Sequence, residues 1–213
     1  QLRENGKVKR GWLGVYIQQM DKDLAESFGL EKPQGAVVAR ILSNSPAEKA
    51  GIEQGDVILK FDNKIVKKSK DLPLLVGTST VNSVIKVELL RGKRKISKYV
   101  KIEELPEDDK IATLTQKTVE RVTISGITIT DIDDATKKSL NVFGGVRVEK
   151  ISSEQSSNSK IMIDDVITQV NGKPIYGKKD FEKVLSQLAN KSLANVLVYR
   201  NNTPLFIALK ISK

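Results

Sequence analysis

The sequence predicts a mainly β fold with short helices, of the α+β class, built from two copies of one compact, mostly antiparallel domain. The main observation is an internal repeat: residues 35–41 match residues 145–151, and residues 56–64 match residues 165–173. Short apolar segments of strand length recur in both copies without the strand–helix alternation of a parallel sheet. A chain of 213 residues is long enough for two such domains.

The first copy begins with a strand, a helix and a second strand. Residues 12–18 alternate around small residues, which predicts a strand with one apolar face. Residues 21–28 predict a short helix that Gly29 can end, and residues 35–42 predict the second strand.

Capping and turn residues define the middle of the first copy. Ser45 is a favoured N-cap, a proline follows at the first helical position, and Gly51 can end the helix. Residues 53–56 predict a turn into a buried strand at residues 57–61. We interpret Asp56, the last residue of this turn, as a structural residue with a turn or cap role.

The first copy ends with a helix and a hairpin. Asp71 can cap a helix that runs to Val76, and residues 84–90 and 96–102 predict two strands joined by a turn. In the second copy the middle helix gives way to a serine-rich run at residues 152–159, which is either a loop or a poorly formed helix.

The domain boundaries follow from the repeat and from one acidic stretch. A run of acidic residues with a proline and no apolar periodicity lies between the copies and predicts an extended linker. The predicted organisation is a connector at residues 1–9, a first domain at residues 10–102, an acidic linker at residues 103–118, and a second, degenerate domain at residues 119–213.

The composition argues for a binding module. The chain has no cysteine and no histidine, which excludes disulfides, thiolate or His-ligated metals, a cysteine nucleophile and a Ser-His-Asp triad. The acidic groups Asp131, Asp133 and Asp134 lack the spacing of a calcium loop, as does the pair Asp164 and Asp165, so cap and turn roles are expected. We expect no catalytic residue, no metal and no cofactor in this chain.

The net charge of +10 raises nucleic acid as a partner. However, the densest basic runs fall in predicted turns, and only 5% of the residues are aromatic, with no set of stacking residues. We therefore interpret the lysines as a solvated surface and expect no nucleic-acid partner. No stretch approaches the eighteen apolar residues of a membrane span, so no integral membrane segment is expected.

A candidate peptide site lies at the first strand. Gly14 sits where a turn brings successive backbone N–H groups to face one point, and such a nest binds a carboxylate. The strand that follows, residues 15–19, can then accept an extended peptide by β-augmentation. The residues expected to bind peptide are Arg10, Trp12, Leu13, Gly14, Val15, Tyr16, Ile17, Leu72, Leu75 and Val76.

Several of these residues have an alternative interpretation. Leu13, Val15 and Ile17 form one apolar face that is either a pocket wall or ordinary core, and the same holds for the facing helix. Arg10 either adds charge to the carboxylate site or faces solvent. Trp12 either covers the site or is a partly buried anchor.

The sequence resembles a known family at three places. Residues 45–51, Ser-Pro-Ala-Glu-Lys-Ala-Gly, and residues 55–58, Gly-Asp-Val-Ile, resemble the core signature of a PDZ domain of the HtrA/DegP family. Residues 10–15, Arg-Gly-Trp-Leu-Gly-Val, are similar to the strand that follows the protease domain in that family. The resemblance implies two PDZ-like, partly open antiparallel β-barrels or sandwiches, each with about two helices, and a protease domain absent from this chain.

The resemblance also implies a function. The chain would be the substrate-binding and regulatory region of an HtrA/DegP-like periplasmic serine protease that acts in protein quality control, in the bacterial periplasm or in association with the envelope. It would bind hydrophobic C-termini or extended segments of unfolded proteins, without proteolytic activity of its own. Its other partners would be its own protease domain and, in the full-length protein, further copies of itself. The alternative is a stand-alone PDZ scaffold that organises an envelope or secretion complex without proteolysis.

The second copy departs from the family pattern. Its candidate nest is Ser125-Gly126-Ile127, where no apolar residue precedes the glycine. We expect this domain to fold but to bind C-terminal peptides poorly, and the resemblance implies a role in oligomer contacts.

Overall fold

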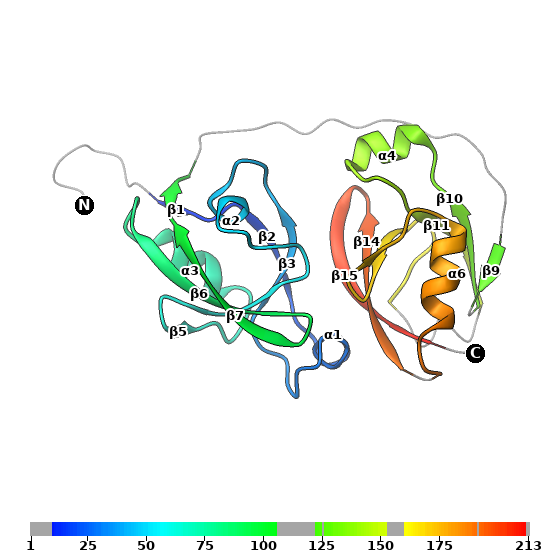
Figure 1. The fold of residues 1–213 in the computed structure, drawn as a ribbon, viewed down its shortest axis with the longest axis horizontal. Coiled ribbons are helices and arrows are strands. Elements are labelled where there is room, and N and C mark those ends of the chain that lie inside the picture. The colour runs from blue at the N-terminus through cyan, green and yellow to red at the C-terminus, as the bar shows by residue number, and fades with distance from the viewer. Residues whose placement is uncertain (1–9, 106–121, 125, 153–159, 191, 212–213) are drawn as a thin grey trace. The chain divides into compact units, whose positions relative to one another are not determined.

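The computed structural model describes residues 10–105, 122–124, 126–152, 160–190 and 192–211. The chain forms two compact units, one made of most residues up to Lys110 and one made mainly of residues from Ile111 onward (Figure 1). Each unit is an antiparallel sheet with short helices, so the predicted fold class is confirmed; neither sheet closes into a barrel. The predicted connector and residues 106–118 of the predicted linker lie outside the described residues.

The first unit is built on a sheet in the order β2-β3-β4-β6-β7, in which β5 pairs with β4. A separate two-stranded pair, β1 and β8, places Trp12 opposite Glu103, so the residues predicted to start the linker form a strand here. The elements are β1 (Gly11–Trp12), β2 (Val15–Gln19), α1 (Lys22–Ser27), β3 (Ala36–Ile41), α2 (Pro46–Lys49), β4 (Val57–Phe61), β5 (Lys64–Ile65), α3 (Asp71–Gly77), β6 (Val84–Arg91), β7 (Arg94–Lys101) and β8 (Glu103–Glu104).

The second unit repeats this plan with one addition. Its sheet has the order β15-β14-β12-β11-β10-β9, and β13 pairs with β12. Strand β10 is the counterpart of β2, and the added strand β9 extends the sheet beyond it. The elements are β9 (Val122–Ile124), β10 (Ile127–Asp131), α4 (Asp134–Leu140), β11 (Val146–Ile151), β12 (Val166–Val170), β13 (Lys173–Pro174), α6 (Lys178–Ser186), β14 (Leu193–Arg200) and β15 (Thr203–Lys210). Among the helices that the structure describes, none is both long and apolar enough to cross a membrane.

Helix ends follow the capping residues in the sequence. The Ser45 hydroxyl accepts a hydrogen bond from the Glu48 N–H at 3.2 Å, and α2 starts at the next residue, as predicted. The Asp133 carboxylate accepts one from the Thr136 N–H at 2.8 Å and caps α4, which gives this aspartate the cap role expected from its spacing.

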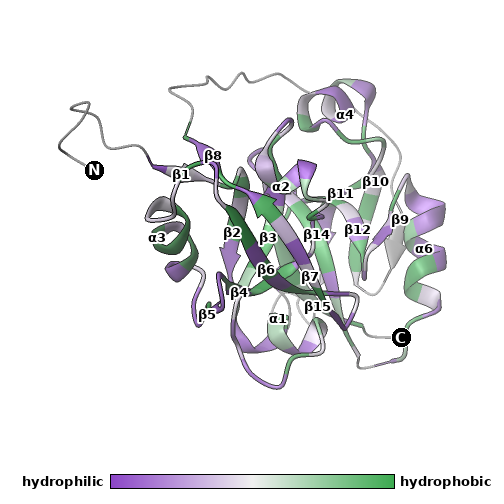
Figure 2. Ribbon diagram, turned by 60° about the vertical axis from the view of Figure 1, so that its left-hand side comes forward, coloured by the Kyte–Doolittle hydropathy of each residue, from purple (hydrophilic) through white to green (hydrophobic). Residues whose placement is uncertain are grey.

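Each unit has its own hydrophobic core, which lies between the sheet and the longer helix. Figure 2 shows apolar residues along the strands of both sheets, with polar residues in the turns and also on the helices and on strands such as β7. Leu72 of α3 and Phe181 of α6 occupy the same place in the two repeats, and both are essentially inaccessible to solvent. Burying one such side chain stabilises a domain by roughly 1.5–3 kcal/mol.

One buried ion pair is repeated in both units. Arg91 donates to both carboxylate oxygens of Asp56, from Nε at 2.8 Å and from Nη2 at 2.7 Å, and Arg200 binds Asp165 at the same two distances. Both aspartates are fully buried. The Asp56 carboxylate, through its hydrogen bonds, raises the pKa of Arg91. Arg91 also donates to the Gly51 carbonyl at 2.9 Å and thereby holds the end of α2 against the β6–β7 hairpin.

Candidate peptide-binding site

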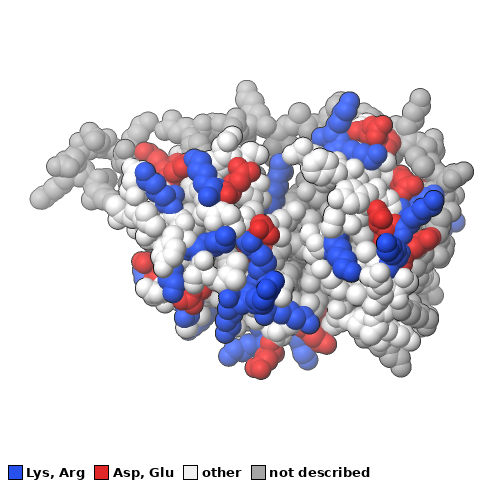
Figure 3. Space-filling view, viewed as in Figure 1, with Lys and Arg blue, Asp and Glu red and all other residues white. Residues whose placement is uncertain are grey.

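The two edges of the first sheet differ in charge. β7 carries four cations on eight residues, Arg94, Lys95, Lys98 and Lys101, whereas β2 has the sequence Val-Tyr-Ile-Gln-Gln and carries none. Figure 3 shows Lys and Arg gathered on the first unit. Charged edge residues discourage the addition of another strand. Among the described residues β2 pairs only with β3, so the open edge suited to an added strand is β2.

The loop before β2 presents unused N–H groups. The carbonyls of Leu13 and Gly14 turn inward, where they accept hydrogen bonds from the N–H groups of Ala47 at 3.0 Å and Leu42 at 2.9 Å. The N–H groups of Leu13 and Gly14 have no partner among the residues described in the structure. They are therefore available to an anion.

Val15 adds a third N–H to the same side. Val15 stands opposite Ile41, and the hydrogen bond from Leu42 to Gly14 makes these two residues a non-hydrogen-bonded pair of the antiparallel ladder. In such a pair the N–H and C=O groups point away from the neighbouring strand. The N–H of Val15 thus faces the open edge, and together with the N–H groups of Leu13 and Gly14 it offers the three successive donors that a carboxylate nest needs.

Gly14 is the residue that this loop needs. Its φ of +77° lies in the left-handed region, and a Cβ at this position would lie 2.2 Å from the Ser45 Cβ and 3.1 Å from the Trp12 Cζ2. The Trp12 ring therefore flanks the loop, and it is only partly buried. No side chain fits at residue 14 without moving Ser45.

The apolar residues predicted for the pocket belong to one cluster. Leu13, Leu72 and Val76 are buried in the core of the first unit, and Val15 and Ile17 pack on it while staying partly exposed. The three buried residues can form the floor of a groove, and Val15 and Ile17 can form its wall. The core interpretation thus holds for Leu13, Leu72 and Val76, and a role of Val15 and Ile17 in a pocket stays a prediction.

Leu75 lies in different surroundings. It packs partly on the core but lines a separate cavity of about 250 Å³ together with Phe61 and Ile85. Its place beside a bound peptide stays a prediction.

Arg10 and Tyr16 are exposed. The Arg10 carbonyl accepts a hydrogen bond from the Leu105 N–H at 3.0 Å, which ties this residue to the end of β8, and its side chain lies in solvent. The guanidinium of Arg40 lies 5.9 Å from the centre of the Tyr16 ring. Because side chains alternate along a strand, Tyr16 points to the face opposite Val15 and Ile17.

A contact missed by the sequence analysis links the far end of β2 to α3. The Ser69 hydroxyl donates to Gln19 Oε1 at 2.8 Å, and the Ser69 N–H donates to the same atom at 3.3 Å. In the second unit the N–H of Lys178, at the start of α6, donates to Asp131 at 2.7 Å. The sequence offered one signal for this contact: the strand ends in a side chain with an oxygen acceptor in both copies, Gln19 in the first and Asp131 in the second.

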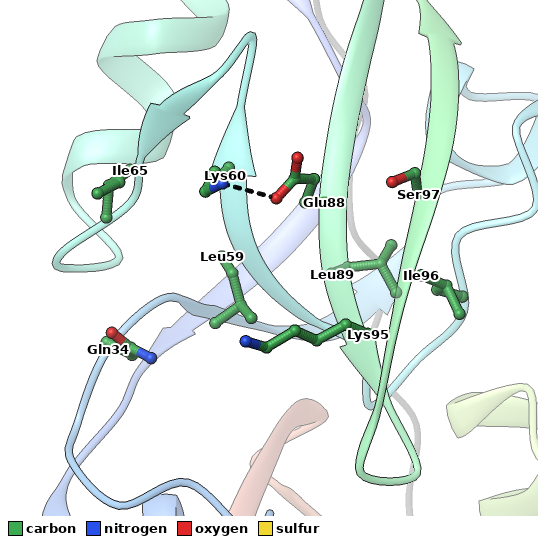
Figure 4. Close-up of a pocket in the computed structure, with 9 residues that line it drawn as sticks. All are labelled: Gln34, Leu59, Lys60, Ile65, Glu88, Leu89, Lys95, Ile96 and Ser97. Carbon is green, nitrogen blue, oxygen red and sulfur yellow. Dashed lines mark ion pairs between the residues drawn. The ribbon is translucent and has the colours of Figure 1, made fainter.

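A second recess of the first unit lies on β4, β6 and β7 (Figure 4). It measures about 280 Å³ and is lined by apolar residues that include Leu59 and Ile96, with Lys95 beside them. Lys60 and Glu88 form an ion pair at 2.9 Å in its wall, and hydrogen bonds from Lys60 and Lys86 lower the pKa of Glu88. Glu88 is therefore ionised at neutral pH and is not suited to donate a proton.

The described residues hold no cluster of three or more His, Cys, Asp or Glu side chains that could bind a metal ion. The chemistry that the described site offers is non-covalent: main-chain donors, a strand edge and partly exposed apolar side chains.

Comparison with known proteins places both units in one family. The family described as "PDZ domain" matches residues 11–102 and residues 124–211, which together make up most of the chain. The matched segments correspond to the two units of the structure.

Whole-chain relatives share one description, "Probable periplasmic serine endoprotease DegP-like". The protein from Hahella chejuensis is 36% identical over 214 residues, covering 100% of this chain and 46% of that protein. The protein from Pseudomonas fulva is 38% identical over 220 residues, covering 100% and 45%. The chain thus spans a little less than half the length of these relatives.

Among solved structures, "HtrA-type protease AlgW with decapeptide" is 32% identical with a TM-score of 0.45, covering 48% of this chain and 32% of that chain.

Proposed function

The chain belongs to the PDZ-domain family as a tandem pair of the HtrA/DegP type, and on that premise we propose that its first domain binds the C-termini or extended apolar segments of unfolded proteins. The observation that carries the proposal is the edge of β2, where an uncharged strand follows three successive N–H groups, those of Leu13, Gly14 and Val15, that have no partner among the described residues. A peptide would pair antiparallel with β2 and place its carboxylate at the N–H groups of Leu13, Gly14 and Val15.

The groove sets the expected preference and affinity. The last side chain of the peptide would enter between the partly exposed Val15 and Ile17 and the buried Leu72 and Val76, which are all aliphatic. A hydrophobic terminal residue is therefore preferred, and its burial contributes roughly 1.5–3 kcal/mol. Together with the hydrogen bonds of the carboxylate and of the main chain, burial of this side chain supports a Kd on the order of micromolar, which corresponds to a binding free energy of about −8 kcal/mol.

The wider role rests on the relatives. Proteins named periplasmic serine endoproteases match this chain along its whole length, which supports a periplasmic location and a role as the substrate-binding and regulatory region of such a protease. This favours the protease-associated role over a stand-alone scaffold. In the full-length protein the domain would hand bound chains to the protease domain, within a homo-oligomer.

The proposal is tested by titrating a fluorescently labelled peptide that ends in valine, with a free or an amidated C-terminus. Val15→Asp should weaken binding at least tenfold, because it removes an apolar wall and sets a negative charge beside the carboxylate. Val84→Asp makes the same change at an exposed residue of β6, away from the β2 edge, and should bind like the wild type. Equal binding by both variants, or no binding by the wild type, would overturn the proposal.

A further inference from the structure

The second domain carries a strand where the first domain has an open edge. β9 pairs antiparallel with β10, with Ile124 opposite Ile127, Thr123 opposite Thr128 and Val122 opposite Ile129. In the first domain the preceding strand, β1, turns away and pairs with β8 instead. The same position in the fold therefore has two arrangements, one that leaves the edge open and one that covers it.

The hydrogen-bonding groups of β10 show what β9 covers. The N–H of Ser152 donates to the Gly126 carbonyl at 2.7 Å, just as Leu42 donates to Gly14. Ile127 and Ile151 are therefore a non-hydrogen-bonded pair, and the N–H and C=O of Ile127 point toward β9. These are the counterparts of the Val15 groups that face the open edge in the first domain.

The side chains agree with the backbone. Val15 and Ile17 are partly exposed in the first domain, whereas Ile127 and Ile129 are completely buried in the second. They belong to the same core cluster as Phe181 of α6. The apolar side chains of β10 are thus shielded from solvent, whereas those of β2 are partly exposed.

We propose that β9 is an intramolecular ligand of the second domain: it occupies the edge at which an extended peptide would otherwise add to β10. A peptide antiparallel to β10 would have its last residue opposite Ile127, and Ile124 of this chain stands there. The partner class is an extended strand with aliphatic residues at alternate positions. The proposal rests on the proposed function in one respect, since it takes strand addition as the binding mode of these domains.

Tethering explains why this edge is closed to other peptides. Only residues 125 and 126 separate β9 from β10, and a short connection gives an effective concentration of about 1 mM or more. β9 has no free carboxylate, so its own Kd for this edge is expected to be weaker than micromolar, about 10–100 μM, and the edge is then open about one part in ten to one part in a hundred. An outside peptide is therefore expected to bind about 10- to 100-fold more weakly here than to the same edge without β9.

The register supplies a matched pair of variants. Hydrogen-bonded and non-hydrogen-bonded pairs alternate along an antiparallel ladder, and Ile124 with Ile127 is a hydrogen-bonded pair. Val122 with Ile129, two residues further on, is therefore hydrogen-bonded too, so the N–H of Val122 faces β10. The N–H of Thr123, between them, points away from β10. Proline is tolerated on an edge strand only where the missing N–H would face solvent. Val122→Pro should therefore release β9, and Thr123→Pro should leave it in place.

The experiment follows backbone amides of the full chain by NMR. In Val122→Pro the Ile127 amide should exchange with solvent at least tenfold faster than in the wild type. The probe is the synthetic peptide Val-Glu-Arg-Val-Thr-Ile, the sequence of residues 119–124, which should then shift the signals of residues 127–131. Thr123→Pro should match the wild type, and retained signals of α6 show that the domain is folded.

Two results would overturn the proposal: unchanged exchange of Ile127 in Val122→Pro, or rapid exchange without any shift at residues 127–131 on adding peptide. A second measurement needs no variant, because millimolar peptide should produce the same shifts in the wild type by displacing β9. The signals of Leu13, Gly14 and Val15 in the same spectra report the first domain. Failure of the proposed function is thus seen separately, as the absence of shifts there.

Discussion

Replacing Arg91 by methionine tests the buried ion pair that each repeat contains. The substitution keeps the length of the side chain but removes the guanidinium, so the buried carboxylate of Asp56 loses two hydrogen bonds, at 2.8 and 2.7 Å, and its counter-charge. Removing one partner of a buried pair destabilises a domain by about 3–5 kcal/mol. The lower end applies here, because the Arg91 side chain is 29% exposed and the Glu53 N–H still donates to Asp56. We expect a loss of about 3 kcal/mol.

The assay is urea unfolding followed by tryptophan fluorescence. Trp12 is the single tryptophan of the chain and lies in the first domain, so its emission reports that domain. With a urea m-value of about 1.5 kcal/mol/M, a loss of 3 kcal/mol lowers the midpoint by about 2 M. Arg200→Met makes the same change in the second domain and should leave the Trp12 transition in place. A midpoint shift below about 0.5 M for Arg91→Met would contradict the reasoning, because so small a loss of stability is what removing an exposed ion pair produces.

Three further outcomes are expected. Gly14→Ala should destabilise the first domain by about 1–3 kcal/mol and weaken peptide binding, because residue 14 has a φ of +77° and an alanine Cβ would lie 2.2 Å from the Ser45 Cβ. An unchanged free energy of unfolding and an unchanged peptide affinity would show that the loop tolerates a side chain. Binding of a valine-terminated peptide should change the Trp12 emission in the wild type and in Val84→Asp alike, since the ring flanks the loop at Gly14. Constant emission at saturation would place the ligand elsewhere. The purified chain should not degrade casein, because it has no histidine for a Ser-His-Asp triad, and turnover that copurifies with the chain through several columns would contradict this.

The sequence predicts the fold well where local chemistry decides it. The cap at Ser45 and the glycine at residue 14 each require one backbone conformation, and both were found where expected. The repeat also placed Asp56 over Asp165 and Arg91 over Arg200, at a shared separation of 35 residues. That coincidence was available as a signal for an ion pair, but the aspartate alone indicated only a turn.

What the sequence does not contain is the choice between alternative strand partners. A short strand precedes the glycine loop in both copies, and only the three-dimensional arrangement shows that β1 pairs with β8 while β9 pairs with β10. The surroundings of Leu75 likewise depend on the rotation of α3 about its own axis. The sequence of this seven-residue helix, which contains several leucines, does not specify which of them face the core. Under our proposal for β9, the weak peptide binding expected of the second domain has a structural cause that the degenerate motif did not suggest.

The most direct test of the account is an NMR titration of the isotope-labelled full chain with a valine-terminated peptide, followed by the same peptide with an amidated C-terminus. The account predicts that the free peptide shifts the amide signals of Leu13, Gly14 and Val15 most strongly, that amidation abolishes those shifts, and that residues 127–131 stay unchanged at micromolar peptide. Shifts centred on residues 127–131, or shifts at the Gly14 loop that amidation leaves intact, would contradict it.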